Sequence, residues 1–285
     1  MPPRWNHLTG ILGLAGTLML GACSTVSSVT SISEDEELQY IASPTNIASL
    51  SDVVERNPND PQVYNMRGSV LGRAGRYQEA IADFNKAIQI DPKYAQAYAN
   101  RALAHREMKQ LDLAYADFNK AIQIDPSYSA AYVGRGTIQR SRGRVQEALG
   151  DFNKAVQLKP DNAQAYHNRG LVYQQQGQHK FAIDEFTTAI SLSTSAAEPN
   201  LARGMSYLAL NDLKSASDDF TEAGEKDPRN VEAWTQRGIV YERMGNKEQA
   251  AASFARALNV AQNYEPARVG FQRVGGEYGK GYSIN

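Results

Sequence analysis

Cysteine is almost absent from this sequence, and histidine does not make up for it. Cys23 is the single cysteine among 285 residues, and the four histidines are scattered along the chain. One cysteine cannot form an internal disulfide, a zinc cage or an iron–sulfur site. We therefore expect no metal and no cofactor.

An excess of one charge sign is missing as well. The chain has 30 Lys and Arg against 31 Asp and Glu, a formal net charge of −1. Proteins that bind nucleic acid normally show a strong basic excess, so we expect no nucleic-acid partner. The patterns G-x-S-x-G, HExxH and the phosphate loop do not occur in the sequence. We therefore predict no catalytic residue and no enzymatic activity.

A long apolar run occurs only at the N-terminus. Residues 8–20 follow Arg4 and are largely apolar, but the run is too short to span a bilayer as a helix. A basic start, a run of this length and a small-residue cleavage site are typical of a secretory signal peptide. The site reads Leu20-Gly21-Ala22-Cys23. It resembles the lipobox of bacterial lipoproteins, in which the chain is cut before a cysteine that becomes lipidated.

That resemblance implies how the N-terminus is used. Residues 1–22 are then the signal peptide, and residues 23–43 are a flexible tether whose Cys23 carries the lipid anchor, palmitate included. Because Ser24 rather than Asp follows the cysteine, the resemblance also implies the outer membrane, with the protein facing the periplasm. An ordinary signal peptide with an incidental cysteine remains the alternative.

An internal repeat dominates the rest of the chain. A phenylalanine recurs every 34 residues, with alanine four residues before it and three after it. A small residue stands sixteen positions before each phenylalanine, and an aromatic residue stands twenty positions before five of the six. The six phenylalanines are Phe84, Phe118, Phe152, Phe186, Phe220 and Phe254.

These spacings predict pairs of helices. Alanine, phenylalanine and alanine at i, i+4 and i+7 lie on one face of a helix, and the small residue lets the other helix approach closely. Between the two helices, a left-handed C-cap needs a residue without Cβ, and four repeats have one there: Gly75, Gly143, Gly177 and Gly245. One hairpin cannot bury its apolar face alone, so neighbouring hairpins must stack.

A 34-residue period with these residues resembles the tetratricopeptide repeat (TPR) family. The resemblance implies an all-α fold, a right-handed α-α superhelix (TPR solenoid). Six helical hairpins are expected over residues 61–264. An N-terminal helical cap over residues 44–60 and a capping helix with a loose tail over residues 265–285 complete the expected layout.

An arginine precedes the small residue in every repeat, and an acid precedes the phenylalanine in five of the six. We predict a structural ladder in which each arginine pairs with the acid of the packed second helix. Ser253 replaces the acid in the sixth repeat. The alternative is a row of ligand-binding arginines.

By the same resemblance, the first helices line a concave groove that takes an extended peptide or a partner helix. The groove-facing columns hold mainly amides, which both donate and accept hydrogen bonds. Simple solvation of these side chains is the alternative. Arg106 and Arg140 share one column in adjacent repeats, and we hypothesise that together they hold an anionic side chain. The predicted binding residues are Gln62, Asn65, Gln96, Asn100, Arg106, Arg140, Gln164, His167, Asn168 and Gln174.

The layout of one lipobox and one TPR body resembles NlpI-type lipoproteins. This implies a lipid-anchored cell-envelope adaptor whose repeat body forms a homodimer, docks a periplasmic protease and recruits peptidoglycan (cell-wall) hydrolases. The alternative is an assembly factor that binds a pilus or secretion subunit, as in TadD or PilF lipoproteins. A scaffold for exopolysaccharide export is a further alternative.

Overall fold

The computed structural model describes residues 42–277 and residue 281, and within them the chain forms fourteen helices. Each repeat supplies a first helix and a second helix, called here the A helix and the B helix. The A helices are α3 (Pro61–Arg73), α5 (Ala95–Glu107), α7 (Ser129–Ser141), α9 (Ala163–Gln175), α11 (Glu198–Ala209) and α13 (Val231–Arg243). The B helices are α4 (Tyr77–Ile90), α6 (Leu111–Ile124), α8 (Val145–Leu158), α10 (His179–Leu192), α12 (Leu213–Lys226) and α14 (Lys247–Val260).

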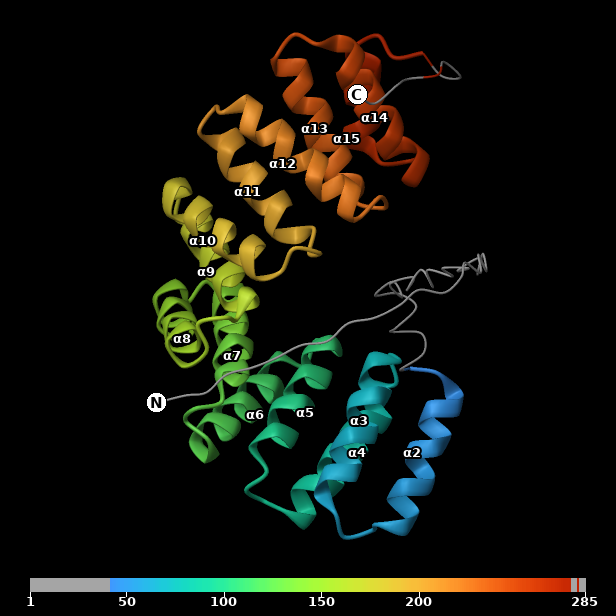
Figure 1. Ribbon diagram of the computed structural model, residues 1–285, viewed down its shortest axis with the longest axis vertical. Coiled ribbons are helices and arrows are strands. Elements are labelled where there is room, and N and C mark those ends of the chain that lie inside the picture. Colours follow the sequence, from blue (N-terminus) through green and yellow to red (C-terminus); the bar gives the residue numbers. More distant parts are fainter. Residues whose placement is uncertain (1–41, 278–280, 282–285) are drawn as a thin grey trace, which may run out of the picture.

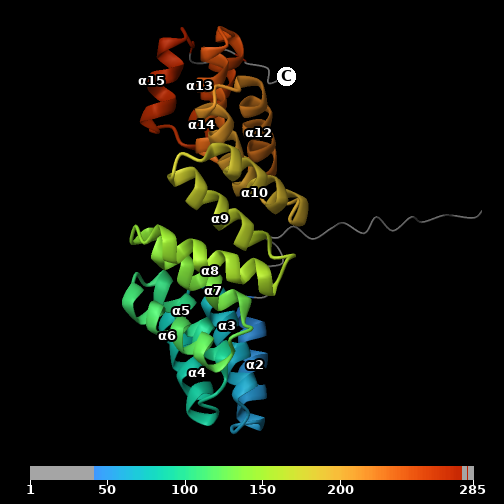
Figure 2. The same cartoon turned by 90° about the vertical axis from the view of Figure 1, so that its left-hand side faces the viewer.

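The hairpins stack in chain order into a curved solenoid. Helices α2–α6 form one end, α7–α10 the middle and α11–α15 the other end (Figure 1). The view turned by 90° shows the same order along the long axis (Figure 2). Successive A helices from α3 to α11 contact one another, more than successive B helices do. The A helices therefore lie on the inner side of the curve, and the prediction of an all-α superhelix of repeats is confirmed.

The core is a column of phenylalanines packed against small residues. All six repeat phenylalanines are at most 2% exposed. A Cβ added to Gly170 would lie 2.6 Å from Cε1 of Phe186, closer than such carbons pack. The small residue therefore sets how closely the A and B helices approach, as the sequence predicted.

A left-handed residue ends the turn between the A and B helices in all six repeats. The four predicted glycines have φ between 72° and 78°. In the second and fifth repeats the sequence has Lys109 and Asn211 at this position, and they adopt φ of 61° and 60°. The turn geometry is thus imposed by the packing of the two helices, even where a Cβ makes it costly.

In four repeats the aromatic residue near the start of the A helix also fixes the preceding loop. The hydroxyl of Tyr132 donates to the carbonyl of Pro126 at 3.2 Å, and Nε1 of Trp234 donates to the carbonyl of Pro228 at the same distance. The fifth repeat has Asn200 here, 2% exposed, with its amide bound to the carbonyl of Ala196. The aromatic column therefore anchors the loops as well as filling space.

The predicted arginine ladder is present in five repeats. In each of them Nε and Nη2 of the arginine donate to the two carboxylate oxygens of the acid, at 2.6–2.9 Å. The pairs are Arg67–Asp83, Arg101–Asp117, Arg135–Asp151, Arg169–Glu185 and Arg203–Asp219. In the sixth repeat, Arg237 is 1% exposed and its guanidinium lies 5.0 Å from the ring centre of Tyr241.

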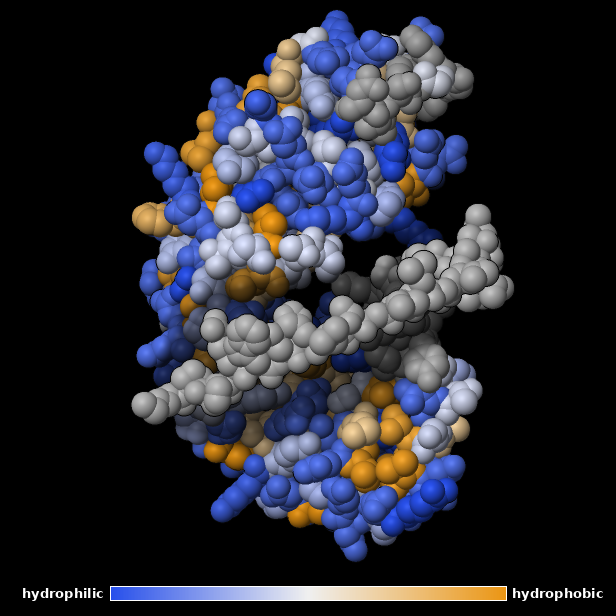
Figure 3. Space-filling view, in the orientation of Figure 1, coloured by the Kyte–Doolittle hydropathy of each residue, from blue (hydrophilic) through white to orange (hydrophobic). Residues whose placement is uncertain are grey.

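Half-repeats close both ends of the described solenoid. Helix α2 (Pro44–Arg56) takes the place of a B helix, since Ser51 accepts a hydrogen bond from Nη1 of Arg67 at 3.3 Å. Helix α15 (Glu265–Arg273) takes the place of an A helix, and Arg273 forms an ion pair with Glu242 of α13. Apolar side chains gather over α2 and α3 on the face shown in Figure 3.

Cys23, the signal segment and most of the tether lie outside the described residues. Among the helices that are described, none has the length and apolar character that crossing a membrane requires.

Candidate functional site

The inner wall is the surface that the A helices present along the inside of the curve. It comprises the positions of Gln62, Asn65, Met66 and Ser69 in α3 and the position of Arg106 in the last turn of α5. The equivalent positions in the other repeats belong to it as well. All ten predicted binding residues belong to this wall. The structure divides nine of them into three groups, the second of which is Gln174 alone, and places Arg106 apart from these.

Two of the four predicted amides in the first two repeats bind to each other. The amide nitrogen of Asn100 donates to Oδ1 of Asn65 at 2.9 Å and to Oγ of Ser69 at 3.2 Å. Asn65, which is 5% exposed, donates in turn to the hydroxyl of Tyr94. These two asparagines therefore join α3 to α5, while Gln62 and Gln96 are exposed.

A second group joins later A helices. The amide nitrogen of Gln174 donates to the carbonyl of Ala202 at 2.8 Å and to Oγ of Ser206 at 2.9 Å. These bonds hold α9 against α11. Gln174 therefore helps to stack the fourth repeat on the fifth, a role that was not predicted from its position in the sequence.

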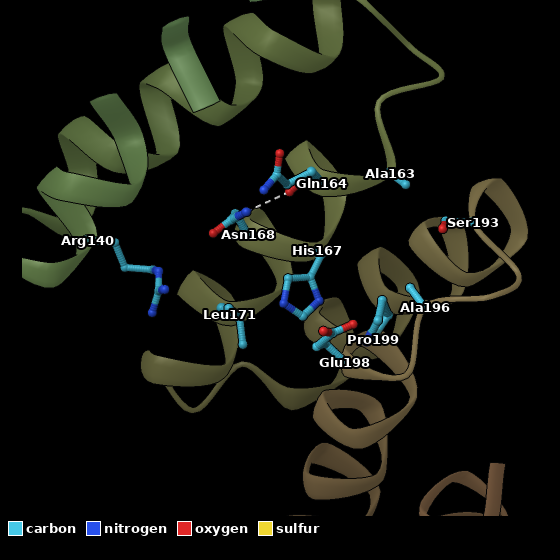
Figure 4. A pocket seen from close by; sticks show the side chains of 10 residues that line it. All are labelled: Arg140, Ala163, Gln164, His167, Asn168, Leu171, Ser193, Ala196, Glu198 and Pro199. Carbon is cyan, nitrogen blue, oxygen red and sulfur yellow. Dashed lines mark hydrogen bonds between the residues drawn. The ribbon is translucent and has the colours of Figure 1, made fainter. Parts of the chain in front are cut away.

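The third group surrounds an open cleft of about 480 Å³ in the middle of the wall. Helix α7 contributes Arg140, α9 contributes half of the lining residues, and the segment between α10 and α11 closes the other side together with the start of α11 (Figure 4). The lining residues are Arg140, Ala163, Gln164, His167, Asn168, Leu171, Ser193, Ala196, Glu198 and Pro199. Four predicted residues, Arg140, Gln164, His167 and Asn168, are thus brought together here.

Arg140 is a cation whose charge is not matched within the described part of the chain. Its Nε is buried without a hydrogen-bond partner there. Burial lowers the pKa of the Arg140 guanidinium from its ordinary value. A partly desolvated arginine in this position favours an anion arriving from outside.

His167 lies between Arg140 and Glu198 in this cleft (Figure 4). Burial lowers the pKa of His167; the Glu198 carboxylate opposes that shift, and Arg140 adds to it. The ring of His167 packs 5.6 Å from that of Phe186, centre to centre. The ring lines the cleft, and its buried Nδ1 has no hydrogen-bond partner among the described residues.

Arg106 is placed differently from Arg140, although the two share a column. It does not line the cleft, and its Nη2 forms an ion pair with Glu107 at 3.1 Å. The structure thus puts one arginine of the hypothesised pair in the cleft.

The inner wall also has an apolar column that was not predicted from the sequence. It consists of Leu103, Leu171 and Met205, each 34 or 68 residues from the next, and Leu103 and Met205 are 40% and 36% exposed. The column could have been found from the sequence, because all three residues occupy the position in their repeats that Ser69 occupies in the first repeat. The wall therefore offers apolar contacts beside its amides.

No group of three or more His, Cys, Asp or Glu side chains that suits a metal ion occurs in the portion of the chain that the structure describes.

Comparison with known protein families matches the repeats directly. Family models described as TPR repeat or tetratricopeptide repeat match residues 50–82, 73–109, 95–128, 136–177, 163–195 and 201–266. The chain belongs to the tetratricopeptide repeat family. TPR proteins are generally scaffolds for protein–protein interaction, and no catalytic family matches this one. A search of curated proteins finds no match.

Solved TPR structures share the fold. The Cut9 and Hcn1 complex of the APC/C superposes with a TM-score of 0.73 at 18% identity over 85% of this chain, and this chain spans 46% of that one. Pseudomonas aeruginosa PilF gives 0.67 at 19% identity, with 77% of this chain and 99% of that one covered. YrrB, described as a TPR protein with an unusual peptide-binding site, gives 0.53 at 26% identity, with 66% and 97% covered.

Proposed function

We propose that this TPR protein is a lipid-anchored adaptor of the cell envelope that binds protein or peptide partners along its inner wall. In this proposal it acts by bringing partners together, a periplasmic protease and peptidoglycan hydrolases among them, and carries out no chemistry itself. The lipid on Cys23 holds it at the outer membrane, facing the periplasm.

The observation that carries the proposal is the composition of the inner wall. The inner wall carries exposed amides such as Gln62 and Gln96, and a separate apolar column of Leu103, Leu171 and Met205. Amides bind the peptide backbone, and apolar side chains supply the contact area that gives affinity. The likeness to YrrB, a TPR protein with an unusual peptide-binding site, agrees with this interpretation.

An assembly factor for a pilus, a secretion channel or an exopolysaccharide export machine is the second candidate. PilW, described as a type IV pilus biogenesis factor, superposes with a TM-score of 0.67, and 97% of its chain is covered. That likeness, at 19% identity, concerns the fold. The same inner wall would then bind a pilin or secretin segment.

Identification of partners separates the two candidates. The full chain is crosslinked in the cells that produce it, purified from the membrane fraction and examined by mass spectrometry. A Leu103→Gln, Met205→Gln double variant tests the inner wall, and a Lys86→Gln, Lys120→Gln double variant of two exposed B-helix residues is its control. A protease or cell-wall hydrolase that is lost only with the first variant supports the adaptor. Pilin, secretin or export subunits support the second candidate, and equal capture by both variants contradicts the use of the inner wall.

The anchor is tested separately with Cys23→Ser. We expect the wild-type chain in the membrane fraction with incorporated acyl label, and the variant unlabelled, since two or more acyl chains anchor a protein stably. Equal membrane retention and labelling of the two chains would contradict the lipid anchor while leaving the binding surface untouched.

A further inference from the structure

We propose that the cleft between α7, α9 and α11 binds one carboxylate group of a partner polypeptide, with Arg140 as its counter-charge. The proposal rests on the proposed function, because it names the chemical group that the inner wall recognises. It differs from the hypothesis of a joint arginine pair, since Arg106 has no part in it.

The ladder shows which edge of an arginine a carboxylate occupies in this protein. In Arg135, Nε donates to Oδ2 of Asp151 at 2.8 Å and Nη2 donates to Oδ1 at 2.6 Å. Arg140 is on the same helix, and its Nε is buried without a partner in the described part of the chain. One external carboxylate on that edge would give Arg140 the arrangement that the ladder arginines have from within.

The neighbouring arginines are already engaged, which limits the charge that the cleft can accept. Arg106 pairs with Glu107 at 3.1 Å, and Arg142 pairs with Asp112 at 2.5 Å while lying over the ring of Tyr115. Among the described residues that line it, the cleft therefore presents a single Lys or Arg, which is Arg140. The planar fork of a guanidinium fits a carboxylate or a phosphate equally well. A phosphate dianion, however, carries more charge and more acceptor oxygens than one guanidinium satisfies, whereas the charge of one carboxylate is matched.

The rest of the lining selects for a carboxylate carried on a polypeptide. Leu171 and the buried Pro199 give the cleft an apolar side, and Gln164 is exposed at its edge as a partner for backbone groups. Glu198 lies beyond His167 and would repel a second acid (Figure 4). A volume of about 480 Å³ holds one side chain with its flanking backbone. The expected partner segment therefore has one acidic residue or a free C-terminus beside apolar residues, and not an acidic run.

A peptide selection tests this directly. The detergent-solubilised full chain is used to select from a library of random eight-residue peptides, prepared once with free C-termini and once amidated. If the cleft binds a side-chain carboxylate, we expect the peptides selected from the amidated library to have Asp or Glu at one position. If it binds a terminal carboxylate, we expect peptides to be selected only from the library with free C-termini. Replacing that carboxylate by its amide should weaken binding about tenfold.

Variants connect the preference to Arg140. In Arg140→Gln the carboxylate and the amide peptide should bind equally, and Arg140→Lys should keep a reduced preference. Arg106→Gln, in the same column but paired with Glu107, is the matched control and should keep the full preference. Thermal midpoints of all variants establish that they are folded.

The outcomes are distinct. Selected peptides without acidic preference, or a preference that survives Arg140→Gln, overturn the carboxylate site and leave peptide binding intact. Failure to select any peptide contradicts the proposed function together with this inference. Saturable binding of inorganic phosphate or of anionic vesicles that Arg140→Gln abolishes, without peptide preference, reassigns the cleft to another anion.

Discussion

Arg135 and Asp151 are joined by two parallel hydrogen bonds, one from Nε at 2.8 Å and one from Nη2 at 2.6 Å. The third nitrogen, Nη1, donates to Oδ1 of Asn119 on the B helix of the preceding repeat at 2.7 Å. One side chain thus holds its own A helix, its own B helix and the neighbouring repeat. Because the acid side chain is only 6% exposed, this pair is more than a surface ion pair, and it sets the register of the hairpins.

Removing the charge of Asp151 tests the ladder. Asp151→Asn keeps the shape but leaves the guanidinium of Arg135 without its counter-charge, so we expect the protein to lose about 2 kcal/mol of stability. The measurement is urea unfolding followed by circular dichroism. Glu79→Gln is the control, because Glu79 pairs with Arg76 on an exposed helix surface. Equal midpoints for the two variants would show that the ladder contributes nothing beyond a surface pair.

Two glycines in neighbouring helices test the close approach of the A and B helices. Gly170→Ala places a Cβ 2.6 Å from the ring of Phe186, so we expect a loss of about 1–3 kcal/mol. Gly150→Ala is the matched control on the exposed side of α8, where nothing lies within 4 Å. It should stabilise the helix by about 0.5–1 kcal/mol. Thermal unfolding of both variants provides the comparison, and a shift of the same sign in the two would refute this packing account.

The left-handed turns give a reciprocal prediction. Lys109 adopts φ of 61° where four other repeats have glycine, so Lys109→Gly should stabilise the protein by about 1 kcal/mol. Gly143→Lys introduces the same strain at φ of 72° and should destabilise it by a similar amount. Thermal midpoints measure both changes. A loss of stability in Lys109→Gly would mean that the lysine side chain contributes contacts that outweigh the backbone strain.

We expect the stability of the protein to depend on pH through His167. Burial holds the pKa of His167 below its ordinary value of 6.5, with Arg140 adding to the shift and Glu198 opposing it. Below pH 6.5 the unfolded chain therefore binds a proton that the folded chain does not. As the pH is lowered, the free energy of unfolding then decreases by at most about 1.4 kcal/mol per pH unit. Above that pH the contribution vanishes.

The check for His167 is a pair of unfolding curves at about pH 7.5 and 5.5. We expect wild type to lose more stability than His167→Gln as the pH is lowered. Identical losses in the two chains would contradict a buried neutral imidazole at this position.

The repeat made most of the fold predictable from the sequence. Phe186 and Gly170 recur with the same spacing in other copies, and six copies of one pattern leave few arrangements that bury all of them. The ladder pair of Arg135 and Asp151 was predictable for the same reason, since both partners keep one register along the chain. Periodicity therefore predicted contacts within a repeat and between adjacent repeats.

The candidate site was less predictable, because it depends on departures from the repeat. Arg106 and Arg140 are equivalent by register, yet Arg106 is followed by Glu107, with which it forms an ion pair at 3.1 Å. Asn65 and Asn100 looked available for a ligand, but their geometry makes them partners of each other at 2.9 Å. Whether a polar side chain on the inner wall is engaged depends on its neighbours in space, which a column of equivalent residues does not reveal.

Contact between a partner and the inner wall tests the central claim most directly. A photo-crosslinking amino acid is placed at Met205, which is 36% exposed on the inner wall, and at the exposed Lys120 on a B helix as the control. We expect irradiated cells to yield one discrete protein adduct from position 205 and none from position 120. An excess of a peptide selected from the library should reduce the yield of the adduct. Adducts at position 120 with none at position 205 would contradict the account, because the partner would then bind the outer surface of the solenoid.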